Sequence, residues 1–99
     1  MSDTGTTDPC EERIPAFIRG VRLQHDRVRD QWIVQAPERA FIIDPIAAAI
    51  LQRVNGETSL RRIIDDLAAA YAAPRDVIAR DVVTMVEDLS HRQVLAVRS

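Results

Sequence analysis

The spacing of apolar and polar residues changes along the chain. Between Val21 and Ile43, apolar residues alternate with polar ones or form short β-branched and aromatic runs, the pattern of strands with one buried face. Three strands are predicted, over residues 21–24, 32–34 and 39–43, and Pro37 marks the corner between the last two. This part of the chain therefore predicts an antiparallel meander.

After the strands the apolar residues recur every three or four positions, the spacing of amphipathic helices. A first helix is predicted to begin at Asp44-Pro45, because the carboxylate can cap free amide groups and proline loses no hydrogen bond at the first helical position. Asn55-Gly56 ends it, a second helix follows over residues 60–71, and a third begins at Pro74. The predicted fold is α+β and winged-helix-like, with an N-terminal three-stranded antiparallel sheet followed by three helices.

The ends of the chain carry weaker signals. Residues 1–12 are small and polar without an apolar period, so we expect a disordered tail followed by one domain over residues 13–99. Ile14–Ile18 is expected to pack on the edge of the domain, and residues 94–97 to close it as a short extended segment. The single cysteine, Cys10, excludes an internal disulfide and a multi-cysteine metal site, and no role is assigned to it.

Composition limits the class of protein. A chain of 99 residues is one domain with a single modest core. No apolar run approaches the ~20 residues that cross a bilayer, and no secretory signal is evident, so we expect a cytoplasmic protein without membrane contact. The basic residues are all arginine, 13 in number against 15 acidic residues, which gives a net charge of −2.

The sequence predicts no catalytic or cofactor site. Neither His25 nor His91 has a second metal ligand at suitable spacing, and the three glycines are too scattered to form a phosphate-binding loop. Glu38-Arg39 is interpreted as an ion pair at the corner of the hairpin and not as a catalytic pair. We therefore expect a protein that is not an enzyme.

A winged helix raises duplex DNA binding as the alternative function. Between Arg75 and Arg92 the third helix carries three arginines and four acidic residues. Because contacts to phosphates supply most of the affinity for DNA, a net negative recognition helix argues against a DNA-binding regulator and against a nucleic-acid partner.

Several short features together resemble the PqqD family. They are the APER corner at residues 36–39, Asp44-Pro45, Ala49-Ile50-Leu51 and Gly56 before Thr58, and the similarity continues through the predicted second and third helices. The chain has Asn55-Gly56 where Asp-Gly is expected and lacks a glycine near Gln93. The resemblance covers about Ile14 to Val97. It implies a peptide chaperone that binds the precursor peptide PqqA and presents it to the radical S-adenosylmethionine enzyme PqqE in pyrroloquinoline quinone (PQQ) biosynthesis.

The resemblance also implies where the peptide binds, and an open sheet edge is suited to a guest strand. The predicted peptide-binding residues are Arg39, Ala40, Phe41, Ile42 and Ile43 on the third strand and Arg75, Val77, Ile78, Ala79, Arg80, Val82 and Val83 on the third helix. Phe41 and Ile43 are expected to face the core, and Ala40 and Ile42 the other side. Val77 and Val83 are spare apolar residues that either contact the peptide or pack on the sheet or first helix. The open edge also permits a monomer or a weak homodimer.

Overall fold

The computed structural model describes residues 9–98 of the chain. Its elements are a 3-10 helix, η1 (Pro9–Glu12), then β1 (Ile14–Phe17), β2 (Arg22–Asp26), β3 (Gln31–Ala36), β4 (Arg39–Ile43), α1 (Pro45–Leu51), α2 (Leu60–Tyr71), α3 (Arg75–His91) and β5 (Leu95–Arg98). The predicted α+β architecture is confirmed, with the three predicted strands as β2, β3 and β4 and the three helices in the predicted order.

The antiparallel sheet has the order β2-β3-β4, so β2 and β4 are its two edges within residues 9–98. Val34 at the middle of β3 lies opposite Leu23 on one side and Phe41 on the other, and its side chain is fully buried. Ile43 is also buried, whereas Ala40 and Ile42 are exposed. The alternation predicted for β4 is confirmed.

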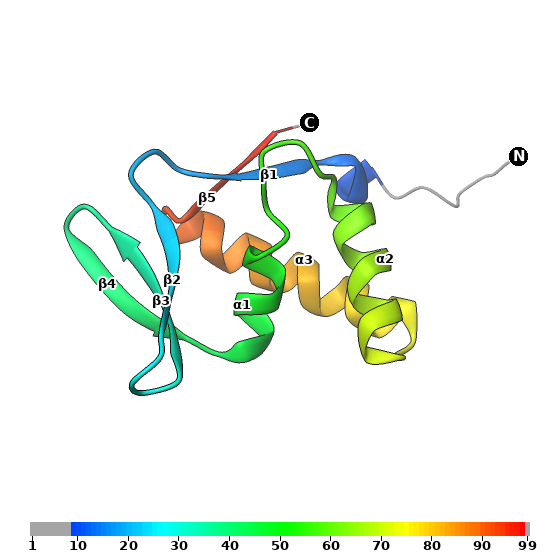
Figure 1. The fold of residues 1–99 in the computed structure, drawn as a ribbon. Coiled ribbons are helices and arrows are strands. Elements are labelled where there is room, and N and C mark those ends of the chain that lie inside the picture. The colour runs from blue at the N-terminus through cyan, green and yellow to red at the C-terminus, as the bar shows by residue number, and fades with distance from the viewer. Residues whose placement is uncertain (1–8, 99) are drawn as a thin grey trace, which may run out of the picture.

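A second, two-stranded sheet joins the two ends of the described chain. β1 pairs antiparallel with β5, with Ile14 opposite Arg98 and Phe17 opposite Leu95, and Figure 1 shows the two strands together above the helices. Residues 94–97 were predicted as an extended segment and Ile14–Ile18 as an apolar segment packed on the edge of the domain, but the pairing of the two was not predicted. No local turn connects them, so no pattern within either segment identifies its partner.

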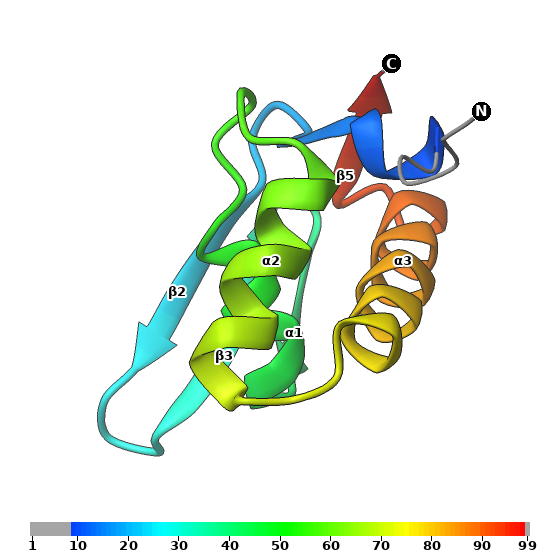
Figure 2. The same ribbon diagram turned by 90° about the vertical axis from the view of Figure 1, so that its right-hand side faces the viewer.

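The helices cover one face of the larger sheet. α1 lies between the sheet and α2, while α3 runs alongside both helices toward the sheet (Figures 1 and 2), and every residue from Ala47 to Leu51 is buried. The three alanines at the start of this run allow close approach, and Ile50, which follows them, has no exposed surface. From α2 and α3, Ile63, Ile64 and Val82 complete the core beneath it.

Asp44 caps α1 as predicted. Its Oδ1 accepts a hydrogen bond from the Ala47 amide at 2.7 Å, and Pro45 occupies the first helical position. We expect Asp44→Ala to lower the free energy of unfolding by ~1 kcal/mol, because the amide loses its acceptor. Urea denaturation measures the change, and Glu38→Ala in the exposed β3–β4 turn is the control. Equal losses in the two variants would show that the cap contributes nothing.

Part of the N-terminal segment that was predicted as a disordered tail is ordered in the structure. Residues 1–8 of the predicted tail, and Ser99, lie outside the described residues, whereas Pro9–Glu12 form η1 and belong to the fold. Glu11 is buried, and its Oε1 accepts a hydrogen bond from Nη2 of Arg75 at 2.8 Å. Asp65 of α2 accepts a second bond from the same guanidinium. These bonds, first that to Glu11 and then that to Asp65, raise the pKa of Arg75 above its ordinary value.

The contact of Glu11 with Arg75 predicts a modest role in stability. Glu11→Gln is expected to lower the free energy of unfolding by ~1 kcal/mol, since it removes the charge from a nearly buried pair while Arg75 stays partly solvated. Glu12, which pairs with Arg61 at the surface, provides the control: Glu12→Gln should cost less than ~0.5 kcal/mol. Thermal or urea unfolding of both variants tests this, and a larger effect at Glu12 would contradict it.

Within residues 9–98, no helix combines the length and apolar character needed to span a membrane. The same part of the chain holds no cluster of three or more histidine, cysteine, aspartate or glutamate side chains arranged to bind a metal.

Candidate functional site: a groove between the end of β4 and α3

A groove of about 460 Å³ lies between α3 and the start of α1, immediately after β4. We call it the α3 groove; it is lined by Asp44, Ile46, Arg80, Asp81, Thr84, Met85 and Asp88. Asp44 follows directly on β4, and β4 has no strand paired to its outer edge within the described residues. A sheet edge and a groove are therefore neighbours, the combination that strand addition requires.

Phe41 connects β4 to the C-terminal end of α3. Its ring lies 5.5 Å from Cζ of Arg92, the residue that caps α3, and 5.7 Å from Cζ of Arg39 on its own strand. Both distances are within the range of cation–π attraction. Arg92 is held in turn by Asp88, whose Oδ2 lies 3.1 Å from its Nε. The Phe41–Arg92 contact joins the C-terminal end of α3 to β4.

Only part of the predicted helix site faces this groove. Arg80 lines it, and Val77, which is 44% exposed, lies one helical turn before Asp81 on the same face. Val82 is buried in the core, and Ala79 packs against it. Ile78 also packs on the core and lines a separate apolar pocket.

Two predicted residues lie away from the α3 groove. Val83 lines a cavity on another face of α3, together with Arg13, Leu60 and Val97. Arg75, predicted to meet the peptide, is instead bound to Glu11 and Asp65 as described above. The structure therefore does not bring Val83 and Arg75 together with Arg80.

Four residues of α3 that line the groove were not among the predicted site residues: Asp81, Thr84, Met85 and Asp88. Asp81, Thr84 and Asp88 recur at intervals of three and four, so they form one face of the helix. Extending the helical spacing from Arg80-Asp81 toward the C-terminus would have found them. The other missed residues, Asp44 and Ile46, are close to α3 only in the folded chain.

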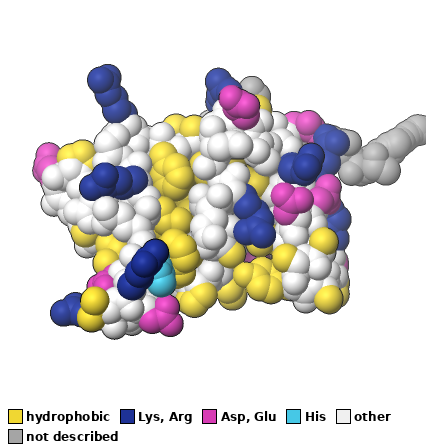
Figure 3. Space-filling view, viewed as in Figure 1, with side chains coloured by type: hydrophobic (Ala, Val, Ile, Leu, Met, Phe, Trp, Pro, Cys, Tyr) yellow, Lys and Arg dark blue, Asp and Glu magenta, His cyan; other side chains and the backbone are white. Residues whose placement is uncertain are grey.

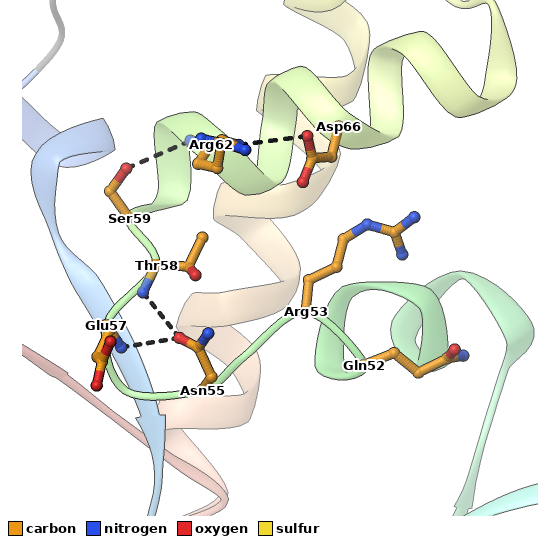
Figure 4. Close-up of a pocket in the computed structure, with 8 residues that line it drawn as sticks. All are labelled: Gln52, Arg53, Asn55, Glu57, Thr58, Ser59, Arg62 and Asp66. Carbon is orange, nitrogen blue, oxygen red and sulfur yellow. Dashed lines mark hydrogen bonds and ion pairs between the residues drawn. The ribbon is translucent and has the colours of Figure 1, made fainter.

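A second concave surface has a different character. It lies at the α1–α2 loop, has a volume of about 620 Å³ and is lined mainly by polar side chains, as Figure 4 shows. Oδ1 of Asn55 accepts hydrogen bonds from the amides of Glu57 and Thr58, both at 2.9 Å. Ser59 caps the Arg62 amide, and Arg62 pairs with Asp66. These groups satisfy one another, and no residue of β2, β3 or β4 lines this surface, so it is not suited to adding a strand to that sheet.

Comparison with known proteins decides the family. The family model described as Coenzyme PQQ synthesis protein D (PqqD) matches residues 31–95, from the start of β3 into β5. The chain belongs to the PqqD family. The residues that line the α3 groove all fall inside the matched region.

Curated relatives of this PqqD-family chain are named for a peptide. The "PqqA binding protein" of Gluconobacter oxydans is 49% identical over 86 residues, which cover 87% of this chain and 90% of the relative. The protein of the same name from Bradyrhizobium diazoefficiens is 43% identical over 81 residues, covering 82% of this chain and 79% of the relative.

Solved structures of PqqD proteins have the same fold. The NMR structure of the PqqD truncation of Methylobacterium extorquens PqqCD is 36% identical, covers 84% of this chain and 88% of that one, and has a TM-score of 0.74. It is described as a functional, stand-alone recognition element for ribosomally synthesised and post-translationally modified peptides. The crystal structure of PqqD from Xanthomonas campestris is 38% identical, covers 96% and 99% of the two chains, and has a TM-score of 0.56.

The α3 groove of this PqqD-family chain carries mixed charge around an apolar floor. Arg80 lies among three carboxylates, those of Asp44, Asp81 and Asp88, while Ile46 and Met85 supply apolar surface. Such a surface can orient a peptide through a few polar contacts and bury one side of it.

Proposed function

We propose that this chain binds the precursor peptide PqqA as a strand added to β4 and presents it to the radical S-adenosylmethionine enzyme PqqE during PQQ biosynthesis. The observation that carries the proposal is the unpaired outer edge of β4 beside the α3 groove. The naming of the relatives as PqqA binding proteins supports the identity of the peptide.

In this proposal the backbone of β4 supplies most of the affinity. A guest strand along Arg39–Ile43 pairs its amides and carbonyls with the free edge. The side chains of the guest strand alternate in direction. Every second one points over the α3 groove, and the others extend the exposed face of the sheet on which Ile42 lies. Acidic side chains of the peptide meet Arg39 or Arg80, neither of which has an ion-pair partner among the described residues.

The proposed role is binding and presentation without chemistry. His25 lies on β2 at the opposite sheet edge, where it hydrogen-bonds Asp30 at 3.0 Å and its ring contacts that of Trp32 at a tilt of 43°, so it does not serve the groove. Asp81 and Asp88 make the exposed face of α3 acidic, which disfavours duplex DNA in the same place. A cytoplasmic location fits a partner enzyme and a ribosomal peptide.

Titration of ¹⁵N-labelled protein with synthetic PqqA tests the binding site. We expect amide shifts along β4 and on the Val77, Thr84 and Asp88 face of α3. Shifts confined to α2 would refute the α3 groove as the binding site but not the adaptor role. No binding at ~100 μM peptide, a concentration well above the micromolar dissociation constant of a useful complex, would refute the function.

A reaction with purified PqqE tests presentation. PqqE should modify PqqA faster when the wild-type chain is added in stoichiometric amount. A rate that is independent of the chain, with peptide binding intact, would show that the chain binds PqqA without presenting it.

A further inference from the structure

An apolar pocket of about 150 Å³ opens where the three helices meet. It is lined by Ile46 and Ile50 from α1, Leu67 and Tyr71 from α2, and Ile78, Asp81 and Val82 from α3. Asp81 is its only charged lining residue. Nothing in the pairing of a guest strand with β4 requires this pocket, since none of its lining residues belongs to the sheet.

Exposed apolar side chains surround the mouth of the pocket. Ile46 is 56% exposed and Tyr71 54% exposed, and Val77 at 44% precedes the pocket residue Ile78. Figure 3 shows apolar side chains along the lower edge of the molecule, from the start of α1 to the end of α2. A ligand that covers large apolar side chains around a concave apolar surface releases the water that hydrates them, which favours binding. Such side chains therefore mark a binding surface.

The pocket continues the α3 groove. Ile46 and Asp81 line both, and Ile46 comes only three residues after Ile43, the last residue of β4. A peptide that pairs with β4 and runs on past Ile43 therefore reaches the mouth of the pocket next. An apolar side chain fits this point best, because every lining residue except Tyr71 and Asp81 offers only apolar side-chain surface, and an acidic side chain would meet the carboxylate of Asp81.

We infer that this pocket receives one large aliphatic or aromatic side chain of the bound peptide, from a residue flanking the segment that pairs with β4. The inference rests on the proposed function and adds a specificity site to it. Apolar cavities of about 150 Å³ accommodate a group of the size of benzene. A leucine, isoleucine or phenylalanine side chain therefore fits it.

The pocket solves a problem that strand pairing leaves open. Backbone hydrogen bonds do not distinguish one peptide sequence from another, and a guest strand displaced by two residues makes the same bonds with the same side-chain direction. A peptide side chain bound in the pocket, at a fixed point beyond Ile43, allows only one register of the guest strand on β4. The edge of β4 then supplies affinity, and the pocket selects the sequence and its alignment.

Tyr71→Glu tests the inference, with Val28→Glu as the matched control. Both positions are exposed apolar residues, at 54% and 94%, but Val28 lies in the β2–β3 turn away from the pocket. Tyr71→Glu should weaken PqqA binding at least ~10-fold by placing a charge at the mouth, whereas Val28→Glu should bind like the wild type. Circular dichroism establishes that both variants are folded.

Two further measurements test the inference without relying only on the affinity of Tyr71→Glu. Methyl resonances of Ile46 and Ile78 in the wild-type protein should shift when PqqA is added. Replacing the residues of PqqA one by one with alanine should identify one apolar residue whose loss weakens binding to the wild-type protein ~10-fold. The same replacement should not weaken binding to the Tyr71→Glu variant any further. If the β4 amides shift while these methyl groups do not and Tyr71→Glu binds normally, the pocket is refuted and the function stands. If wild-type protein does not bind PqqA, both are refuted.

Discussion

Thr84→Trp is expected to weaken PqqA binding by at least ~10-fold, or ~1.4 kcal/mol, without a comparable loss of stability. Thr84 is exposed and lines the α3 groove, so an indole at this position occupies the space proposed for the side chains of the guest strand. No core contact is removed, and the free energy of unfolding should stay within ~0.5 kcal/mol of the wild-type value. Isothermal titration calorimetry measures the affinity.

Glu87→Trp is the matched control on the same helix. Glu87 is also exposed, but it lines the cavity that contains Val83 on another face of α3. Its replacement should leave PqqA affinity unchanged. Equal losses at the two positions, or no loss at Thr84, would show that the peptide does not lie in the α3 groove.

Ile50→Ala is expected to lower the free energy of unfolding by ~2–5 kcal/mol. The side chain has no exposed surface and lies in the core, in the last turn of α1, so its removal leaves a cavity in addition to the lost burial. Because a small domain has only ~5–15 kcal/mol in total, this single change removes a large share of its stability. Urea denaturation with an unchanged m-value measures the loss.

Ile42 offers a control of identical chemistry. It is 61% exposed on the outer face of β4, so Ile42→Ala should cost less than ~1 kcal/mol. Similar losses for the two isoleucines would mean that the packing of α1 contributes less to stability than its burial indicates.

Elements with their own periodic pattern could be predicted from the sequence. Phe41 and Ile43 alternate with Ala40 and Ile42, and both the strand and its buried face follow from that spacing. Asp44 predicted the start of α1 because a cap acts within one helical turn. The pairing of β1 with β5 has no local signal, since the two strands come from opposite ends of the domain.

The site was less predictable because it depends on how α3 is rotated. Val77 and Val83 both lie off the main apolar stripe, and the sequence does not show which flank of the helix adjoins β4. Packing places Val77 on the face of Asp81 and Val83 on another face. From the sequence, Arg75 is expected to be a solvent-exposed cation available to a ligand. In the structure, however, Glu11 of η1 accepts a hydrogen bond from its guanidinium. Tertiary contacts of this kind decide which residues remain available to a ligand.

The β1–β5 pair also determines how this domain can be joined to another. Ile14 lies opposite Arg98, so the chain enters β1 and leaves β5 at the same end of this strand pair. Figures 1 and 2 place these strands at the top, whereas the start of α1, where Ile46 lines the mouth of the apolar pocket, lies at the bottom. A fused enzyme domain with a short linker can therefore sit against β1 and β5 without covering that mouth. The same recognition unit is thus suited to working as a separate protein or as one module of a longer polypeptide.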